Sequence, residues 1–104
     1  MIKVHFTSRQ NHVRLTVSGH AGSDEYGKDL VCAGVSTAVT GVCNTLAKYG
    51  FLDRGTIEMQ EGYVCIETDN ATRDDQLILE TLMITLACVE ESNGQYIHIK
   101  YEEE

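Results

Sequence analysis

The sequence predicts a small α+β domain in which a mixed β-sheet is covered by two helices. Three observations support this fold class. Short segments of alternating apolar and polar residues occur near the start, in the middle and at the end of the chain, and two long apolar segments have helical spacing. No linker or change in composition divides residues 1–104, so we expect a single domain with the element order ββαββαβ.

The N-terminal residues predict a β-hairpin. Residues 2–7 alternate between apolar and polar side chains, and residues 12–17 repeat the pattern after the polar turn Arg9-Gln10-Asn11. A period of two places the apolar side chains of a strand on one face. We therefore expect one face of this hairpin to contact the core and the other to contact water.

The first helix is predicted over residues 30–48. This segment has apolar side chains at helical spacing and few charges, so most of it should be buried. Asp29 is a suitable N-cap, because its carboxylate can accept hydrogen bonds from the free N–H groups of the first turn. Gly50 is a suitable stop, since glycine readily adopts the left-handed conformation that ends many helices.

The second half of the chain predicts another hairpin, a second helix and a last strand. Residues 56–59 and 63–68 have the pattern of two short strands joined by a two-residue turn. Thr72 begins a Thr-x-x-acid sequence, which is typical of helix starts, and the helix is predicted over residues 73–91. Alternating apolar residues predict the last strand over residues 97–101.

The composition argues against a nucleic-acid-binding protein. Lys and Arg number 8 and Asp and Glu number 16, which gives a formal net charge of −8. Such a surface repels phosphate groups and offers no basic stripe for groove binding. The N-terminal segment has no signal-peptide core, and we expect no segment to span a bilayer. We therefore expect a cytoplasmic protein with no nucleic-acid or membrane partner.

The four cysteines predict neither a metal site nor a disulfide framework. They lie at positions 32, 43, 65 and 88, without the CxxC spacing of many zinc sites, and each falls in a predicted helix or strand. We therefore expect reduced thiols, no bound metal and no cofactor. Among the four, Cys32 is distinguished by its place at a predicted helix start, where a thiolate is stabilised.

Cys32 and His20 lie at opposite ends of a glycine-rich segment. His20 closes an alternating strand pattern, and Cys32 opens the apolar helical segment. A thiol nucleophile requires a nearby base, and a loop of this length can bring the two side chains together. The pattern predicts the site of a cysteine hydrolase, with Cys32 as nucleophile and His20 as general base and acid. The other histidines, at positions 5, 12 and 98, occupy polar strand positions and are assigned to solvent.

Four neighbouring residues are predicted to support this site. Asp29 caps the helix and can also orient His20, while Ser36 lies one turn after the cysteine on the same side of the helix. Gly22 and Gly27 lie between the histidine and the cysteine. They can act as hinges of a loop that gates access to the site.

The chain resembles the ribosomal-processing cysteine proteases of bacteria in residues 19–21 (Gly-His-Ala) and 29–36 (Asp-Leu-Val-Cys-Ala-Gly-Val-Ser). Its length and element order agree with that family along essentially the whole chain. The resemblance implies an endopeptidase that removes an N-terminal extension from large-subunit ribosomal protein twenty-seven, after a hydrophobic, aromatic-containing motif. It implies catalysis by Cys32 and His20, and support from Asp29 and Ser36.

The resemblance also implies a homodimer in which the loop before Cys32 gates access. The long apolar stretches of both predicted helices agree with burial against a second copy, and we expect the second helix to form the interface. Two alternatives stay open at this point. In a noncatalytic ribosome-assembly module Cys32 would be a core residue, and in a redox sensor it would be an oxidisable thiol.

Overall fold

The protein is described by a computed structural model that covers residues 1–19 and 26–104, with the backbone alone for residues 26–29. The predicted order ββαββαβ is confirmed, with one short 3-10 helix added before the third strand. The elements are β1 (Ile2–Arg9), β2 (His12–Ser18), α1 (Tyr26–Lys48), η1 (Phe51–Asp53), β3 (Gly55–Gln60), β4 (Tyr63–Thr68), α2 (Arg73–Ser92) and β5 (Ile97–Glu103).

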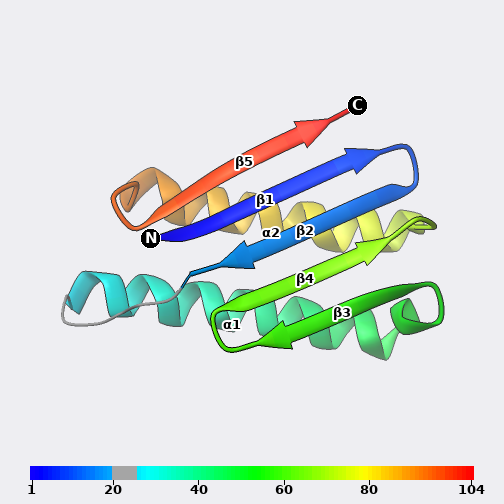
Figure 1. Ribbon diagram of the computed structural model, residues 1–104, viewed down its shortest axis with the longest axis horizontal. Coiled ribbons are helices and arrows are strands. Elements are labelled where there is room, and N and C mark those ends of the chain that lie inside the picture. The colour runs from blue at the N-terminus through cyan, green and yellow to red at the C-terminus, as the bar shows by residue number, and fades with distance from the viewer. Residues whose placement is uncertain (20–25) are drawn as a thin grey trace.

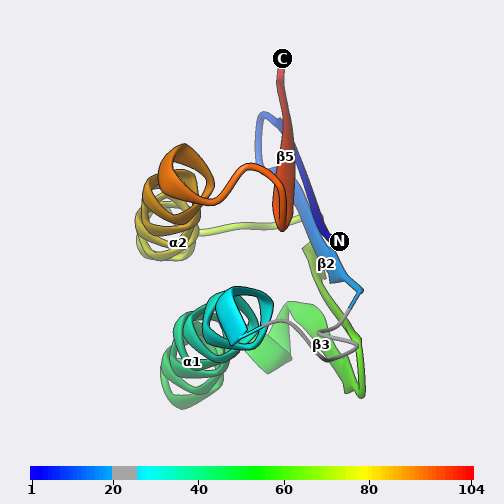
Figure 2. The ribbon, with the colours of Figure 1, turned by 90° about the vertical axis from the view of Figure 1, so that its left-hand side faces the viewer.

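The strands form one mixed sheet in the order β3-β4-β2-β1-β5 (Figure 1). All neighbouring pairs are antiparallel except β1 and β5, which are parallel. The parallel pair arises because α2 carries the chain back along the sheet before β5 begins. Figure 2 shows that both helices cover the same face, so the other face of the sheet is open.

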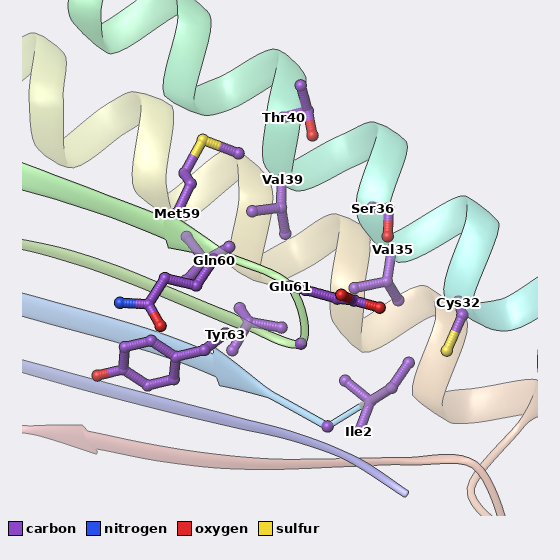
Figure 3. Close-up of a pocket in the computed structure, with 14 residues that line it drawn as sticks. Ile2, Cys32, Val35, Ser36, Val39, Thr40, Met59, Gln60, Glu61 and Tyr63 are labelled. Carbon is purple, nitrogen blue, oxygen red and sulfur yellow. The ribbon is translucent and has the colours of Figure 1, made fainter. Parts of the chain in front are cut away.

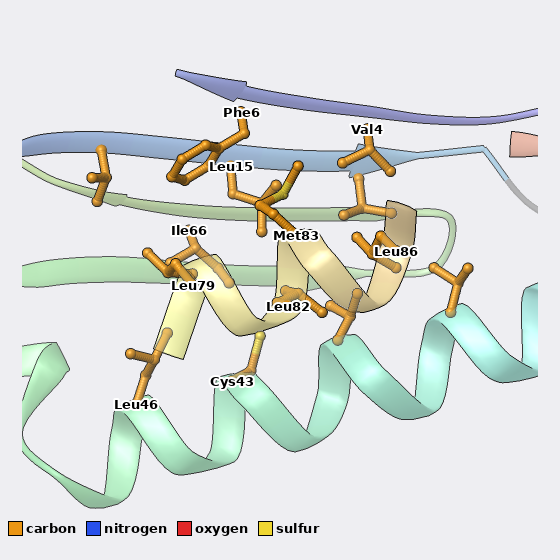
Figure 4. Close-up of a cluster of buried hydrophobic side chains, with 14 of the residues drawn as sticks. Val4, Phe6, Leu15, Cys43, Leu46, Ile66, Leu79, Leu82, Met83 and Leu86 are labelled. Carbon is orange, nitrogen blue, oxygen red and sulfur yellow. The ribbon is translucent and has the colours of Figure 1, made fainter. Parts of the chain in front are cut away.

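The core lies between the sheet and the two helices (Figure 4). Leu15 and Ile66 are opposite each other on β2 and β4, and both are fully buried. On the helix side, Leu79, Leu82 and Leu86 follow the spacing of one helical face and are also fully buried. Each such side chain contributes roughly 1.5–3 kcal/mol by leaving water. The alternation of apolar residues in the strands and their helical spacing in α2 therefore both correspond to this one core.

The start of α2 has the predicted capping arrangement. The Thr72 hydroxyl accepts a hydrogen bond from the Asp75 backbone N–H at 3.0 Å, and the Asp75 carboxylate accepts one from the Thr72 N–H at 2.9 Å. This reciprocal pair satisfies two donors that would otherwise lack partners at a helix start. The predicted helix start is therefore confirmed, and the helix ends at Ser92, one residue beyond the predicted 73–91.

The predicted start of the first helix is wrong. The helix begins at Tyr26, so Asp29 lies within its first turn and is not an N-cap, and Cys32 lies in the second turn. Beyond the first turn, backbone N–H groups bond to carbonyl groups four residues earlier and are not free. A polar first turn carries no apolar periodicity, so the pattern that begins at Leu30 could not reveal it.

The expectation that no segment could span a bilayer is also wrong, if only the length and the composition of a segment are considered. The 19 residues Leu30–Lys48 are long and apolar enough to do so. However, the core helix of a soluble protein passes the same test. In this structure α1 contributes one continuous stripe to the core, which consists of Val31, Val35, Val39, Cys43 and Leu46. Much of its exposed surface consists of small uncharged residues, among them Ala33, Gly34, Thr37 and Gly41.

Candidate active site

A groove of about 370 Å³ lies between α1 and the β3–β4 hairpin (Figure 3). Its walls are the second to fourth turns of α1 and the tip of the hairpin, and Val17 and Gly19 close it at the end of β2. The lining is more apolar than polar. A concave, largely apolar site with few polar groups is the usual form of a binding site for an organic ligand.

The helical wall of the groove presents Cys32, Ser36 and Thr40. A spacing of four residues places these side chains in one row along α1, and Figure 3 shows Cys32 and Ser36 on the side of the helix that faces the groove. Cys32 is half-buried, whereas Ser36 and Thr40 are exposed. The thiol is therefore accessible from the groove and is held on a rigid element, which is the placement that a nucleophile requires.

The hydroxyl of Ser36 differs from those of Thr37 and Thr45 on α1. Thr37 and Thr45 each donate a hydrogen bond to the carbonyl oxygen four residues earlier, at 2.9 Å. Within the part of the chain that the structure describes, the Ser36 hydroxyl has no such partner. It is thus available to a ligand in the groove, one turn from the Cys32 thiol.

The hairpin wall contributes Met59 and Glu61 from the other side. Figure 3 shows the Glu61 side chain extending from the hairpin tip toward α1. Met59 is 49% exposed, although it points to the helix side of the sheet. Tyr63 also borders the groove, but its side chain lies on the open face, where interaction with the Cys65 side chain raises the pKa of its phenol. Met59 and Glu61 are therefore the hairpin side chains that a ligand would meet.

Gly19 closes the groove in a conformation that other residues rarely adopt. Its φ angle is 97°, and a Cβ atom at this position would lie 2.2 Å from the Met1 carbonyl oxygen. Its N–H donates a hydrogen bond to the Gly62 carbonyl at 3.0 Å, which ties the end of β2 to the turn of the hairpin. Glycine is required here both by the backbone angle and by the close approach.

The structure tests the predicted site residues only in part. His20 and Gly22 lie outside the described residues, and so does the side chain of Asp29. Gly27 lies inside the first turn of α1, so a hinge at this position would have to be part of the helix. Cys32 and Ser36 are brought together in the groove.

The other three cysteines do not line this groove. Cys43 is buried in the core, and burial raises the pKa of its thiol, which keeps it protonated. Cys65 lies in the middle of β4, and Cys88 is exposed on α2. Over the described ranges 1–19 and 30–104, no group of three side chains of the metal-binding types occurs.

The sequence-based reasoning missed the hairpin wall. It predicted the β3–β4 hairpin correctly, but nothing in the spacing of residues connected Met59 and Glu61 with Cys32. The signal that could have connected them is Met59. It is an apolar residue on the inner face of a short strand, and such a residue calls for a partner surface such as a ligand.

Comparisons with known proteins agree on one family. The model of the family described as "Cysteine protease Prp" matches residues 1–98. The "Ribosomal processing cysteine protease Prp" of Staphylococcus aureus is 33% identical over 89 residues, which are 83% of each chain. The protein of the same name from Bacillus subtilis is 32% identical over 94 residues, which are 81% of this chain and 84% of the relative.

A solved structure supports the same relationship. The S. aureus Prp protease in complex with a substrate peptide has a TM-score of 0.78 and 30% sequence identity, over 98% of this chain and 100% of that chain. Its fold is therefore the fold described above, and its crystals contain a bound peptide.

Proposed function

Because this chain belongs to the Prp family of cysteine proteases and is a cysteine endopeptidase, we propose that it removes the N-terminal extension of large-subunit ribosomal protein twenty-seven. We assign the nucleophile to Cys32 and the general base and acid to His20. The observation that carries this proposal is the half-buried Cys32 thiol at the wall of a largely apolar groove. A hydrophobic segment of a peptide matches such a lining.

In the proposed reaction, His20 takes the proton of the Cys32 thiol, and the sulfur attacks the scissile carbonyl carbon. His20 then protonates the leaving amine, and water hydrolyses the thioester. Asp29 supports the reaction by orienting His20. The segment between His20 and Cys32, with Gly22 and Gly27, orders over the bound peptide and holds it in place for the attack by the sulfur.

The negative charge that develops on the carbonyl oxygen requires a donor. Since α1 begins at Tyr26, the N–H of Cys32 lies inside the hydrogen-bond ladder of the helix and cannot supply this donor as a free helix-start amide would. The Ser36 hydroxyl faces the same groove, one turn away. We therefore assign Ser36 to the stabilisation of this oxygen or of the bound substrate next to it.

The charge of the protein fits a basic substrate. The chain carries a formal net charge of −8, and Glu61 places a carboxylate at the groove itself. Ribosomal proteins are commonly basic because they contact RNA, so an acidic protease attracts them at long range. Glu61 would favour a substrate with Lys or Arg near the segment that lies in the groove.

Mass spectrometry tests the proposed reaction. A peptide spanning the N-terminal extension of the host's ribosomal protein twenty-seven is incubated under reducing conditions with wild-type protein and with the Cys32→Ala, His20→Ala and Cys88→Ala variants. We expect one defined cut by the wild type and by the control Cys88→Ala, whose thiol is remote from the groove. Cleavage that persists in Cys32→Ala would rule out the assigned nucleophile.

We also propose that the protein is a homodimer and that the outer faces of the helices form the contact. Leu77 and Ile84 are 58% and 59% exposed, seven residues apart and therefore on one side of α2. On the neighbouring helix, α1 exposes Gly34 and Gly41, which allow a second helix to approach closely (Figure 2). Apolar side chains this exposed are stabilised by a partner surface.

Light scattering after size-exclusion chromatography measures the oligomeric state of the protein. We expect a dimer for the wild type and a monomer for Ile84→Glu, because a buried unpaired carboxylate destabilises the contact. Leu52→Glu is the control, since Leu52 is exposed to the same degree, 57%, but lies on η1 and on neither helix. A wild-type monomer at micromolar concentration would contradict the proposal.

A further inference from the structure

β3 forms one edge of the sheet. Half of the backbone N–H and C=O groups of β3 point away from the sheet. The two-residue turn Glu61-Gly62 makes Gln60 and Tyr63 the closing pair of the hairpin, and such a pair exchanges both of its hydrogen bonds. The bonded positions alternate along the strand, so Glu58 also bonds to β4. The N–H and C=O groups of Ile57 and Met59 therefore point outward.

These outward groups have no partner among the described residues. The sheet ends at β3, and no hydrogen bond to Ile57 or Met59 from outside the sheet is made by residues 1–19 and 30–104 or by the backbone of residues 26–29. Natural sheets usually protect such edges with proline, lysine or a bulge. β3 has the sequence GTIEMQ, with no proline or lysine, and it pairs with β4 in unbroken register. The edge is therefore able to accept another strand.

The opposite edge of the sheet is different. β5 has the sequence IHIKYEE. On the face of the sheet that the helices leave open, β5 carries Lys100 and Glu102, which form an ion pair at 3.2 Å. Charged side chains of this kind discourage the pairing of a further strand. β3 carries only one charged side chain, Glu58, which accepts a hydrogen bond from the Gln60 side chain at 2.7 Å, so this edge is less charged than the edge at β5.

Met59 connects this open edge with the groove. Its backbone groups lie at the edge, while its side chain lines the groove that contains Cys32. β3 runs toward the hairpin tip, and α1 passes beside it with Cys32 beyond Thr40 in the direction of the helix start (Figures 1 and 3). An extended chain added to β3 would thus run beside the row of Cys32, Ser36 and Thr40.

We infer that the substrate peptide binds as an additional β-strand on the outer edge of β3, hydrogen-bonded to the backbone of Ile57 and Met59. This inference rests on the proposed function, since it concerns how the peptide reaches Cys32. Every second side chain of the peptide then points toward α1 and enters the groove beside Met59. The backbone bonds provide affinity for any extended sequence, and the alternate side chains provide selectivity.

A set of N-methylated peptides tests this inference with an unaltered strand β3. The probe is the synthetic ribosomal extension peptide, methylated at one backbone nitrogen at a time, and its Kd is measured by fluorescence anisotropy on the Cys32→Ala variant, which holds the peptide without cutting it. N-methylation at alternate residues should weaken binding on the order of tenfold, the effect of a lost hydrogen bond, and methylation between them should change little.

A pair of variants tests the same bond from the protein side. Met59→Pro removes the outward N–H without breaking a bond to β4, because proline is tolerated where the N–H of an edge strand points to solvent. Met59→Ala removes the side chain but keeps the N–H. We expect KM to be roughly tenfold higher for Met59→Pro than for Met59→Ala, at similar kcat, as expected for lost binding alone. Circular dichroism confirms that both variants are folded.

The outcomes separate the two proposals. If wild-type protein cuts the peptide but N-methylation shows no alternation, the strand-pairing inference is overturned and the proposed function stands. If Met59→Pro does not fold, the peptide series alone decides. If wild-type protein neither cuts nor binds the peptide, the proposed function fails, and the inference fails with it.

Discussion

The guanidinium group of Arg54 donates two hydrogen bonds to the carboxylate of Asp75, from Nε at 2.8 Å and from Nη2 at 2.7 Å. Asp75 is only 3% exposed and also accepts the N–H of Thr72 in the capping arrangement. The Arg54 carbonyl accepts the hydroxyl of Thr68 on β4. This pair therefore joins the start of α2 to the segment between η1 and β3, at the end of the β3–β4 hairpin opposite the tip that lines the groove (Figure 1).

Replacing Asp75 with Asn should strongly destabilise the protein. The substitution leaves the Arg54 guanidinium partly buried without a counter-charge, and such a loss costs about 3 kcal/mol. The free energy of unfolding is measured by urea denaturation. Asp74→Asn is the control, since this exposed carboxylate in the same turn lacks a side-chain partner among the described residues, and we expect a change below about 1 kcal/mol. Equal effects of both substitutions would contradict the role of the ion pair.

The same carboxylate should make stability depend on acid. Burial would raise the pKa of Asp75, but the hydrogen bonds from Arg54 and Thr72 outweigh burial and hold its pKa below the ordinary value. In the unfolded chain it titrates near the ordinary value of about 3.9. Its contribution to stability is therefore complete above about pH 5, and it is lost as the pH falls through 4 and below. Urea denaturation between pH 6 and pH 3 should show a smaller loss for Asp75→Asn than for wild type.

Gly55→Ala should destabilise the fold through steric overlap. A Cβ atom at this position would lie 2.6 Å from the Glu67 carbonyl oxygen and 2.8 Å from Cε2 of Phe51. Overpacking of this kind costs about 1–3 kcal/mol. In contrast, in the monomeric Ile84→Glu background Gly41→Ala should raise the free energy of unfolding by about 1 kcal/mol, because a Cβ there meets no described atom of the same chain within 4 Å and alanine favours the helix. Thermal unfolding of both variants shows directly whether one substitution lowers stability and the other raises it.

Gly19→Ala should reduce cleavage more than its effect on folding explains. The positive φ angle and the close approach to Met1 force the backbone to shift at the end of the groove, next to the segment that contains His20. We expect kcat/KM to fall at least tenfold, the order of effect that a misplacement of about 1 Å produces. The measurement is made below the melting temperature of the variant. An unchanged kcat/KM would show that Gly19 does not position the site.

Ser36→Ala tests the donor assigned to the developing oxyanion. Loss of one such donor typically lowers kcat about 10²–10³-fold, with a smaller effect on KM. Thr37→Ala is the matched control, because its hydroxyl donates to the Ala33 carbonyl on the helix itself and is not part of the groove. A Ser36→Ala enzyme with wild-type kcat would assign the residue to structure alone.

Much of the fold was predictable because it depends on local patterns. The alternation in β1 and β2 and the spacing of Leu79, Leu82 and Leu86 correspond to the buried faces observed in the structure. The start of α2 was predictable because the capping arrangement involves residues three apart in the sequence. The start of α1 was not predictable, since its first turn has no apolar spacing. This difference affects the site, because Cys32 lies in the second turn and not beside the free amides of the helix start.

The order of the elements, the family and the cysteine assigned as nucleophile could be read from the amino-acid sequence, because each depends on residues close together in the chain. That the β3–β4 hairpin forms the second wall of the groove, and that the outer edge of β3 is open beside it, became visible in the folded chain. The pairing of β4 with β2 is a long-range contact, which short-range patterns do not encode. It brings Met59 and Glu61 to Cys32, and no local preference of these residues encodes that approach.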